Sequence, residues 1–389
     1  MGLSLAQSHE NIRQQSAALG RLAWIKWSTG DYITAQAYAQ DTQRLAKVSG
    51  NLQHEALGLH TEVLCCQALG HFRECIFLIM RANALLELCG LFQGQLHYTL
   101  MTCQAEVHLL KSEYARACTL HRQLLQTYQG GELHYEGLSL INIAGAEVPT
   151  GVLCEVIQEK ICASQTIFKQ TRDKRLFTAC DMIQADLNLR EGDMSCSLFC
   201  KCLKFGLGRF SDIVIYCLER LADVTCWGPH HDPSWSTVLL AHSLKAKEKL
   251  GIHKALQFIG DVHLIENDEF TAVSLFTVAL EGFTCMDVHR SRAECIIRLG
   301  DMAKKNGDLL RALELWETAR PLFEHSLQAK RVQDIDKRIG GISEEVKEQH
   351  QKNLARAELS VPAGRVEEVD GDTEELGLVE EEQVELIAA

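Results

Sequence analysis

The densest group of potential metal ligands in this sequence is a short run in which Cys226 is followed by His230, His231 and Asp232. Thiolate, imidazole and carboxylate groups are the ligands that zinc takes in proteins. The spacing C-x3-H-H-D matches no strong zinc signature, however, and adjacent histidines in a loop bounded by prolines are usually exposed polar residues. We therefore predict that this run holds no metal.

A second group of sulfur ligands, Cys196, Cys200 and Cys202, has the wrong spacing for a zinc knuckle. Cys196 and Cys200 share one face of a helix and are expected to pack in the core. Nucleophilic catalysis has no support either, because the chain contains no G-x-S-x-G elbow and no H-E-x-x-H motif. The sequence thus predicts no catalytic residue, no metal site and no enzyme activity.

Two glycine-containing runs fall short of phosphate-binding loops. Residues 145–151 lack both the spacing and the lysine of G-x4-G-K-[ST]. Residues 205–210 lack the last glycine of a dinucleotide fingerprint, because Ser211 takes its place, and no strand is expected before them. This run is better interpreted as a helix end followed by a turn. We predict no bound cofactor.

The elements that must position any functional residue are expected to be helical. Of the 389 residues, 46% are apolar and only five are proline. No alternation of Val, Ile and Thr recurs, whereas Ala, Leu, Glu, Gln and Lys are abundant. This composition favours an all-α protein with a continuous core.

The net charge of −13 is concentrated near the end of the chain, because residues 366–389 contain ten acidic residues and no basic ones. The rest of the chain is close to neutral, which argues against a nucleic-acid partner or an anionic membrane. The N-terminus does not read as a signal peptide, and no apolar run approaches the roughly 20 residues that span a bilayer. The 16 cysteines are scattered rather than clustered as in disulfide-rich proteins. We therefore expect a cytoplasmic protein without a membrane partner.

Small or turn-forming residues interrupt the helical pattern about every 40 residues, which is typical of stacked repeats. The breaks are Gly30, Gly70, Ser112, Gly151, Gly192, Asn267 and Gly307. An irregular unit lies near residues 216–250, where two prolines forbid a continuous helix. The predicted fold is a right-handed α-solenoid of about eight helical hairpins.

The two clearest units show how such a hairpin is expected to pack. Gly260 and Gly300 each end a large-x2-(Ile/Leu)-Gly motif on the first helix. An Ala-x3-aromatic-x2-Ala motif follows on the second helix, with Phe276 or Trp316 as the aromatic residue. The glycines allow paired helices to approach closely, and the rings are expected to fill the gap toward the next hairpin.

These motifs resemble the tetratricopeptide (TPR) repeat superfamily over roughly residues 20–335, with a period longer than the standard one of about 34 residues. Four runs are also similar to long-period arrays of mushroom-forming fungi: 191–193 (EGD), 255–261 (ALQFIGD), 276–283 (FTVALEGF) and 315–323 (LWETARPLF). In some proteins of that fungal group the array follows a NACHT-type nucleotide-binding domain. The resemblance implies a protein-binding α-solenoid or, alternatively, a sensor array that works with a NACHT-type signalling ATPase made as a separate chain.

The expected organisation is a TPR-like α-solenoid over residues 1–335, a capping or exposed helix over 336–359, and a disordered acidic tail over 360–389. The first hairpin begins almost at Met1 and leaves little room for an N-terminal cap. An uncapped solenoid end tends to pair with something, so self-association through this end is expected as one outcome.

Repeat register places an acidic residue beside the close-packing position of five first helices, on the side that usually lines the concave groove. These acids are Glu106, Asp186, Asp223, Asp261 and Asp301. Stacked hairpins would align them as a ladder that suits a basic or amide-rich partner. Repeat duplication alone would also copy an acid onto a solvated helix face. Trp24 and Trp27 are candidate anchors at the N-terminal end of the groove, with a core or cap role as the alternative.

The sequence therefore predicts a non-catalytic scaffold or adaptor. Its partner would be a protein or peptide, basic in character, whose helical or extended segment lies in the concave groove. A few aromatic or apolar anchors would supply most of the binding energy, and the acidic ladder would set the register.

Overall fold

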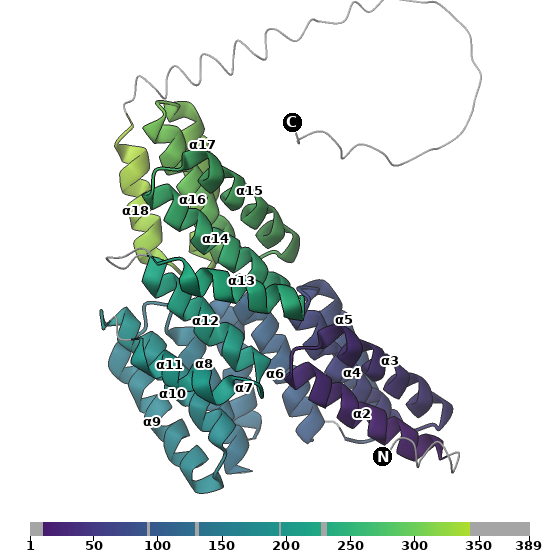
Figure 1. Ribbon diagram of the computed structural model, residues 1–389. Coiled ribbons are helices and arrows are strands. Elements are labelled where there is room, and N and C mark those ends of the chain that lie inside the picture. Colours follow the sequence, from purple (N-terminus) through teal and green to yellow (C-terminus); the bar gives the residue numbers. More distant parts are fainter. Residues whose placement is uncertain (1–10, 92–93, 129–131, 194–195, 227–231, 343–389) are drawn as a thin grey trace, which may run out of the picture. The chain divides into compact units, whose positions relative to one another are not determined.

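The computed structural model describes residues 11–91, 94–128, 132–193, 196–226 and 232–342 (Figure 1). Throughout these ranges the chain forms helices and the turns that join them, without a strand. They belong to one compact unit that ends at Ile342. The acidic tail predicted for 360–389, most of the helix predicted for 336–359, and the histidine pair at 230 and 231 lie outside the described residues.

The described helices pair into eight successive hairpins, which confirms the predicted α-solenoid. The first helices are α2 (Ile12–Ser28), α4 (Leu52–Ala68), α6 (Gln95–Leu110), α8 (Leu133–Glu147), α10 (Lys174–Arg190), α12 (Ser211–Cys226), α14 (Lys249–Ile265) and α16 (His289–Lys305). The second helices are α3 (Tyr32–Val48), α5 (Phe72–Leu88), α7 (Tyr114–Thr127), α9 (Cys154–Thr171), α11 (Ser197–Gly206), α13 (Ser234–Ala246), α15 (Glu269–Met286) and α17 (Leu309–His325). α18 (Ala329–Gly340) follows and packs on α17, so the boundary expected at residue 335 falls inside this helix.

Residues with a left-handed backbone follow the first helix in six hairpins. They are Gly30, Gly70, Ser112, Gly192, Asn267 and Gly307, with φ between +64° and +94°. Glycine, and to a lesser degree asparagine, tolerates this conformation, which is why these positions were visible as breaks. The next residue is often an aspartate that caps the second helix. The Asp31 carboxylate accepts from the N–H of Thr34 at 3.4 Å, and Asp308 accepts from that of Arg311 at 3.1 Å.

Glycine on the first helix and an aromatic ring on the second helix pack within one hairpin. A Cβ added to Gly260 would lie 2.9 Å from the ring of Phe276, and one added to Gly300 would lie 2.7 Å from the indole of Trp316. The ring therefore fills the hollow that the missing Cβ leaves in its own hairpin. Each ring also lies near an arginine of a following helix, as expected for a ring that faces the next hairpin: Arg298 lies 5.8 Å from the ring centroid of Phe276, and Arg338 lies 5.9 Å from that of Trp316.

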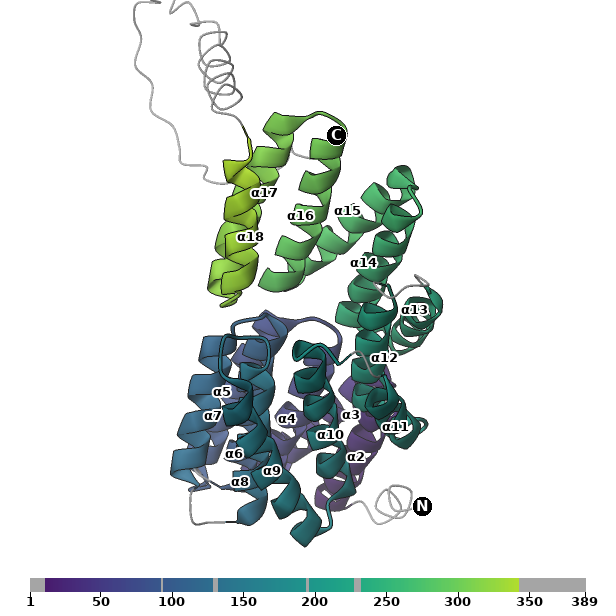
Figure 2. The same cartoon turned by 90° about the vertical axis from the view of Figure 1, so that its left-hand side faces the viewer.

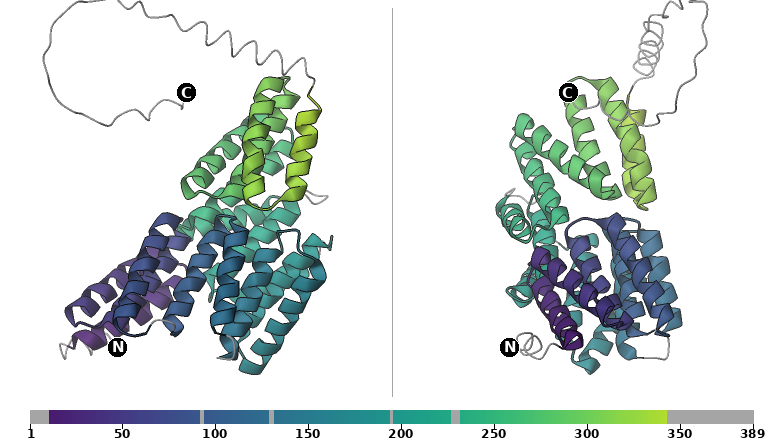
Figure 3. Two further views of the ribbon diagram at one scale, coloured as in Figure 1. Left: turned by 180° about the vertical axis from the view of Figure 1, so that it is seen from behind. Right: turned by 90° about the vertical axis from the view of Figure 1, so that its right-hand side faces the viewer.

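Four hairpin turns of the first half of the array (α2–α9) contact the starts of four helices in the second half (α10–α18). The contacting pairs are Gly30 with Ser211, His71 with Lys249, Lys111 with Asp287, and Pro149 with Gln328. The last three meet through polar atoms at 3.3, 2.9 and 2.5 Å. Partners are 178 or 179 residues apart at His71 and Pro149, so the array comes back on itself after about half of the chain. We call these contacts the seam; Figures 2 and 3 show both halves from further sides.

The apolar core also crosses the seam. One cluster of buried side chains combines residues of α4, α5 and α6 with residues of α14, α15 and α16. Among the described helices, only α15 is long and apolar enough, by length and composition alone, to cross a membrane, which the sequence did not lead us to expect. Ala272, Phe276, Ala279 and Phe283 of α15 are fully buried in this shared core. We therefore interpret the apolar inner face of α15 as a packing surface.

Candidate partner-binding surface

The five ladder acids all lie on first helices, each directly after the small residue of the close-packing position. Glu106 is on α6, Asp186 on α10, Asp223 on α12, Asp261 on α14 and Asp301 on α16. Asp261 is fully buried, whereas the other four are partly exposed. The acids therefore recur at one structural position, as the repeat register requires.

Three of these carboxylates are paired with an arginine of the next first helix or, at the end of the array, of α18. The pairs are Asp186 with Arg220 (3.1 Å), Asp261 with Arg298 (2.9 Å), and Asp301 with Arg338. Each arginine follows its acid by about one repeat. This spacing is visible in the sequence and could have predicted the ion pairs, but the sequence-based prediction considered only the acids. A paired carboxylate offers less charge to a basic ligand than a free one.

Burial is the largest influence on two of the paired acids. It raises the pKa of Asp261 to about 6, and Arg298 opposes only part of this rise. Burial likewise raises the pKa of Asp186, against the opposing effects of Arg220 and of the Tyr216 hydroxyl, which donates to the carboxylate. Pairs held this deeply fix the register of neighbouring first helices, because separating them would leave a buried charge without a partner.

Asp223 differs from the other aspartates of the ladder. Within the described part of the chain it has no hydrogen bond and no ion pair. Its charge contributes to raising the pKa of both Asp186 and Asp261 and also acts on Arg220, so its carboxylate lies within electrostatic range of these groups. Asp223 is therefore a carboxylate without a direct partner, near carboxylates that are already paired.

Glu106 has a more enclosed environment. Its carboxylate meets the side-chain amide of Gln67, and it lies near both Asp212 and Arg175. Burial, with a smaller contribution from Asp212, raises the pKa of Glu106 to about 7. This side chain is therefore partly protonated near neutral pH and carries less negative charge than an ordinary glutamate.

Further charged residues lie on α12, which carries Asp223, and on the next two first helices, α14 and α16. Lys254 is 3.9 Å from Glu219, and Glu294 accepts from Arg290 at 2.9 Å. Burial alone would raise the pKa of Glu294, but Arg290 and Lys254 help to lower it. We call Glu219, Asp223, Lys254, Arg290 and Glu294 the inner band. Its alternating charges suit a ligand that carries groups of both signs.

The two candidate tryptophans lie close together on α2, with ring centroids 4.9 Å apart. The indole N–H of Trp27 donates to the carbonyl of Leu64 at 3.3 Å, and the guanidinium of Arg175 lies 5.9 Å from its ring centroid. Trp27 thus joins α2 to α4 and α10, which fits the core role that the sequence left open. Trp24 is 43% exposed and stays a candidate anchor.

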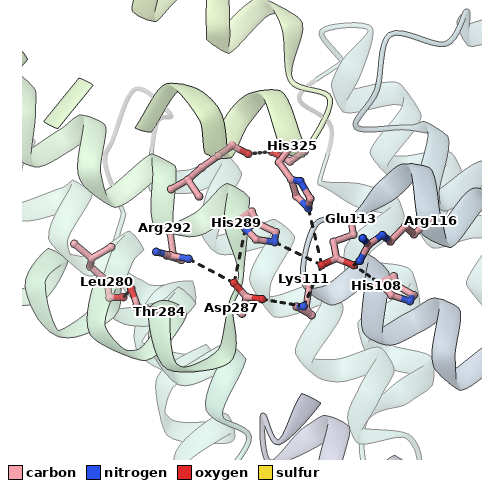
Figure 4. A network of polar contacts seen from close by, with 12 residues as sticks. His108, Lys111, Glu113, Arg116, Leu280, Thr284, Asp287, His289, Arg292 and His325 are labelled. Atoms are coloured by element: carbon pink, nitrogen blue, oxygen red, sulfur yellow. Dashed lines mark hydrogen bonds and ion pairs between the residues drawn. The ribbon is translucent and has the colours of Figure 1, made fainter. Parts of the chain in front are cut away.

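A polar network at the seam centres on the buried carboxylate of Glu113 (Figure 4). Lys111 lies 3.0 Å from Oε1, and His108 Nδ1 lies 2.5 Å from Oε2. His289 and His325 of the second half direct their Nε2 atoms toward Oε1, at 3.6 and 3.9 Å. Sequence reasoning missed this group because its members come from distant repeats and share no local motif.

Comparison with known proteins supports the helical-repeat fold and does not test the resemblance to the long-period arrays of mushroom-forming fungi. No family model and no curated protein matches the chain. Among 34 matching solved chains is the crystal structure of a Rap protein complexed with competence and sporulation factor. The alignment covers 88% of this chain and 99% of that one, with 9% sequence identity and a TM-score of 0.52. This similarity shows a shared helical-repeat fold, and the link to fungal NACHT-associated arrays stays a prediction.

Proposed function

We propose that this protein is a non-catalytic scaffold that binds a segment of a partner protein along the inner band. Asp223 carries the proposal, because it is a partly exposed carboxylate without a partner in a region where neighbouring acids are neutralised. The solved Rap protein of similar fold holds a bound factor, which supports binding as the use of such an array.

The chemistry of the inner band indicates what the partner segment must offer. Asp223 would accept from a lysine, an arginine or an amide of the partner. Lys254 and Arg290 are each engaged with a glutamate, and both could also contact an acidic group of the partner. The segment is therefore expected to carry mixed charge with a donor at its centre, rather than a purely basic sequence.

Affinity capture with a matched pair of variants tests this proposal. The immobilised chain, its Asp223→Asn variant and a Glu317→Gln variant would be incubated with lysate of the source cells, and bound proteins identified by mass spectrometry. Glu317 is an exposed acid on α17, so its variant has the same charge change away from the inner band. We expect a discrete partner on the unmodified chain and on the control, and at least a fivefold loss with Asp223→Asn, about 1 kcal/mol. Equal capture by all three chains would refute binding at Asp223.

Self-association through α2 is a second proposal, based on two neighbouring exposed apolar residues, Trp24 and Ile25. Exposed apolar side chains next to each other on a helix favour contact with another protein surface, here a second copy of this chain. Sedimentation of the chain and of a Trp24→Glu variant tests this, and a monomeric unmodified chain at high concentration would refute it. We also propose a cytoplasmic location, because the 16 cysteines are scattered along the chain rather than clustered as in disulfide-rich secreted proteins.

A further inference from the structure

We propose that Glu113, His289 and His325 form a binding site for a divalent transition metal such as zinc, which fastens the two halves of the array together at the seam. The three residues come from two hairpins, one in each half of the array. Glu113 immediately precedes α7, His289 is the first residue of α16, and His325 is the last residue of α17. A metal held by all three would therefore join the first half of the array to the second.

The donor atoms converge on one point. The Nε2 atoms of His289 and His325 lie 3.6 and 3.9 Å from Oε1 of Glu113, and one ligand atom of each residue lies within 4.8 Å of the other two. In a tetrahedral zinc site with bonds of about 2.0–2.1 Å, neighbouring ligand atoms are roughly 3.3 Å apart. Small side-chain rotations would close the difference, and His325 is partly exposed, so its ring has room to turn.

His289 supplies an independent observation. Both of its ring nitrogens are buried, and neither makes a hydrogen bond within the described residues: Nε2 lies 3.6 Å from Oε1 of Glu113 and Nδ1 lies 3.9 Å from Oδ1 of Asp287. Buried polar atoms in native structures are normally satisfied, so an unsatisfied imidazole beside a carboxylate and a second imidazole calls for an explanation. A metal ion bound at Nε2 would provide one. Two imidazoles and one carboxylate favour zinc or a similar transition metal over magnesium or calcium, which prefer oxygen ligands.

Lys111 is the competitor for this position. Its ammonium group lies 3.0 Å from Oε1 of Glu113 and 2.9 Å from Oδ2 of Asp287. A metal at Oε1 would repel Lys111, which can stay paired with Asp287 when it leaves Glu113. The site is thus one in which a metal and a lysine exchange, and removal of the lysine should strengthen metal binding.

Cobalt(II) is a suitable probe, because its visible absorption changes when it binds nitrogen and oxygen ligands at low coordination number. The untagged chain would be titrated with cobalt, then zinc, in a background in which His71, His230 and His231 are alanine, which removes other groups of potential donors. The variants are His325→Ala, Lys111→Met and the control His263→Ala. His263 pairs with Asp268 at the end of another first helix, as His108 pairs with Glu113. Circular dichroism would check that each variant folds.

We expect His325→Ala to weaken cobalt binding at least about tenfold, and Lys111→Met to tighten it at least about threefold. His263→Ala should leave it within about twofold of the background chain. Zinc should raise the thermal unfolding midpoint of the background chain but not of His325→Ala, because the metal binds the folded state. Absence of cobalt binding, or binding that His325→Ala leaves unchanged, would overturn the proposal. A Lys111→Met variant that binds cobalt more weakly would also contradict it, because Lys111 would then support the site instead of competing for it.

Discussion

Replacement of Arg298 by methionine should show that the arginines paired with the ladder acids hold the first helices together. The Asp261 carboxylate is fully buried and accepts from Nη2 of Arg298 at 2.9 Å, and the Arg298 side chain is 17% exposed. Without the arginine, a buried carboxylate loses its counter-charge, which lowers the free energy of unfolding by about 3–5 kcal/mol. The control variant Arg311→Met breaks the surface pair with Glu314. It should lower the free energy of unfolding by less than about 1 kcal/mol.

The loss should depend on pH, because Asp261 can bind a proton when its partner is gone. The folded-state pKa of Asp261 is about 6, above the ordinary value of 3.8, so the folded state binds the proton more tightly than the unfolded chain does. The contribution of Asp261 to stability therefore falls as pH rises from about 4 to about 6. Removal of Arg298 raises this pKa further and extends the fall to higher pH. Arg298→Met should thus lose more stability at about pH 8 than at about pH 5.

Urea unfolding, followed by far-ultraviolet circular dichroism at both pH values, measures these differences. The double variant Asp261→Asn with Arg298→Met should recover at least half of the loss at high pH, because no uncompensated charge stays buried. Equal and small losses for Arg298→Met and Arg311→Met at both pH values would refute the reasoning. That result would mean that water reaches Asp261 in the folded protein.

Two further predictions concern packing and proton binding. Gly300→Ala should lower the free energy of unfolding by about 1–3 kcal/mol, because its Cβ would lie 2.7 Å from the indole of Trp316. The control is Gly340→Ala, whose Cβ would meet nothing within 4 Å and which should change the free energy of unfolding by less than about 1 kcal/mol. Equal shifts of the thermal unfolding midpoint for the two variants would contradict the packing argument. Burial lowers the pKa of His60 to about 4, so its contribution to stability is lost as pH falls from about 6.5 toward 4. A His60→Gln variant should show a shallower decline of stability over this pH range, and an unchanged decline would argue against a buried, neutral His60.

The repeat fold could be predicted because each hairpin needs particular residue types at single positions. Gly30 and Asn267 occupy left-handed positions that few residues tolerate, and Gly300 sits under an indole that leaves no room for a Cβ. The charge state of the ladder acids was harder to predict. In the sequence Asp261 has no basic neighbour, and only the folded array places Arg298, about one repeat later, next to its carboxylate. The pattern of acids and arginines spaced by one repeat was nonetheless present in the sequence.

The seam could not be predicted from local patterns. His71 and Lys249 are 178 residues apart, and they meet only because small rotations between successive hairpins add up to a complete return of the array. No single residue determines the total rotation of the array, so no local motif predicts that its two halves meet. The cluster of Glu113, His289 and His325 could not be predicted for the same reason: its residues come from distant repeats, and each residue type is ordinary at its own position.

The seam changes how this array should behave as a repeat protein. In an open solenoid each repeat contacts only its neighbours, and the ends can unfold without disturbing the middle. Here Gln328, at the end of the array, donates to the carbonyl of Pro149, so loss of the last helices would also uncover turns of the first half. Unfolding should therefore be more cooperative than in an open array.

Helix α16 links the seam to the inner band, because His289 at its start belongs to the seam and the adjacent Arg290 belongs to the inner band. A metal at Glu113 and a partner at Asp223 would both act on this helix, and each is expected to change the affinity for the other by the same factor.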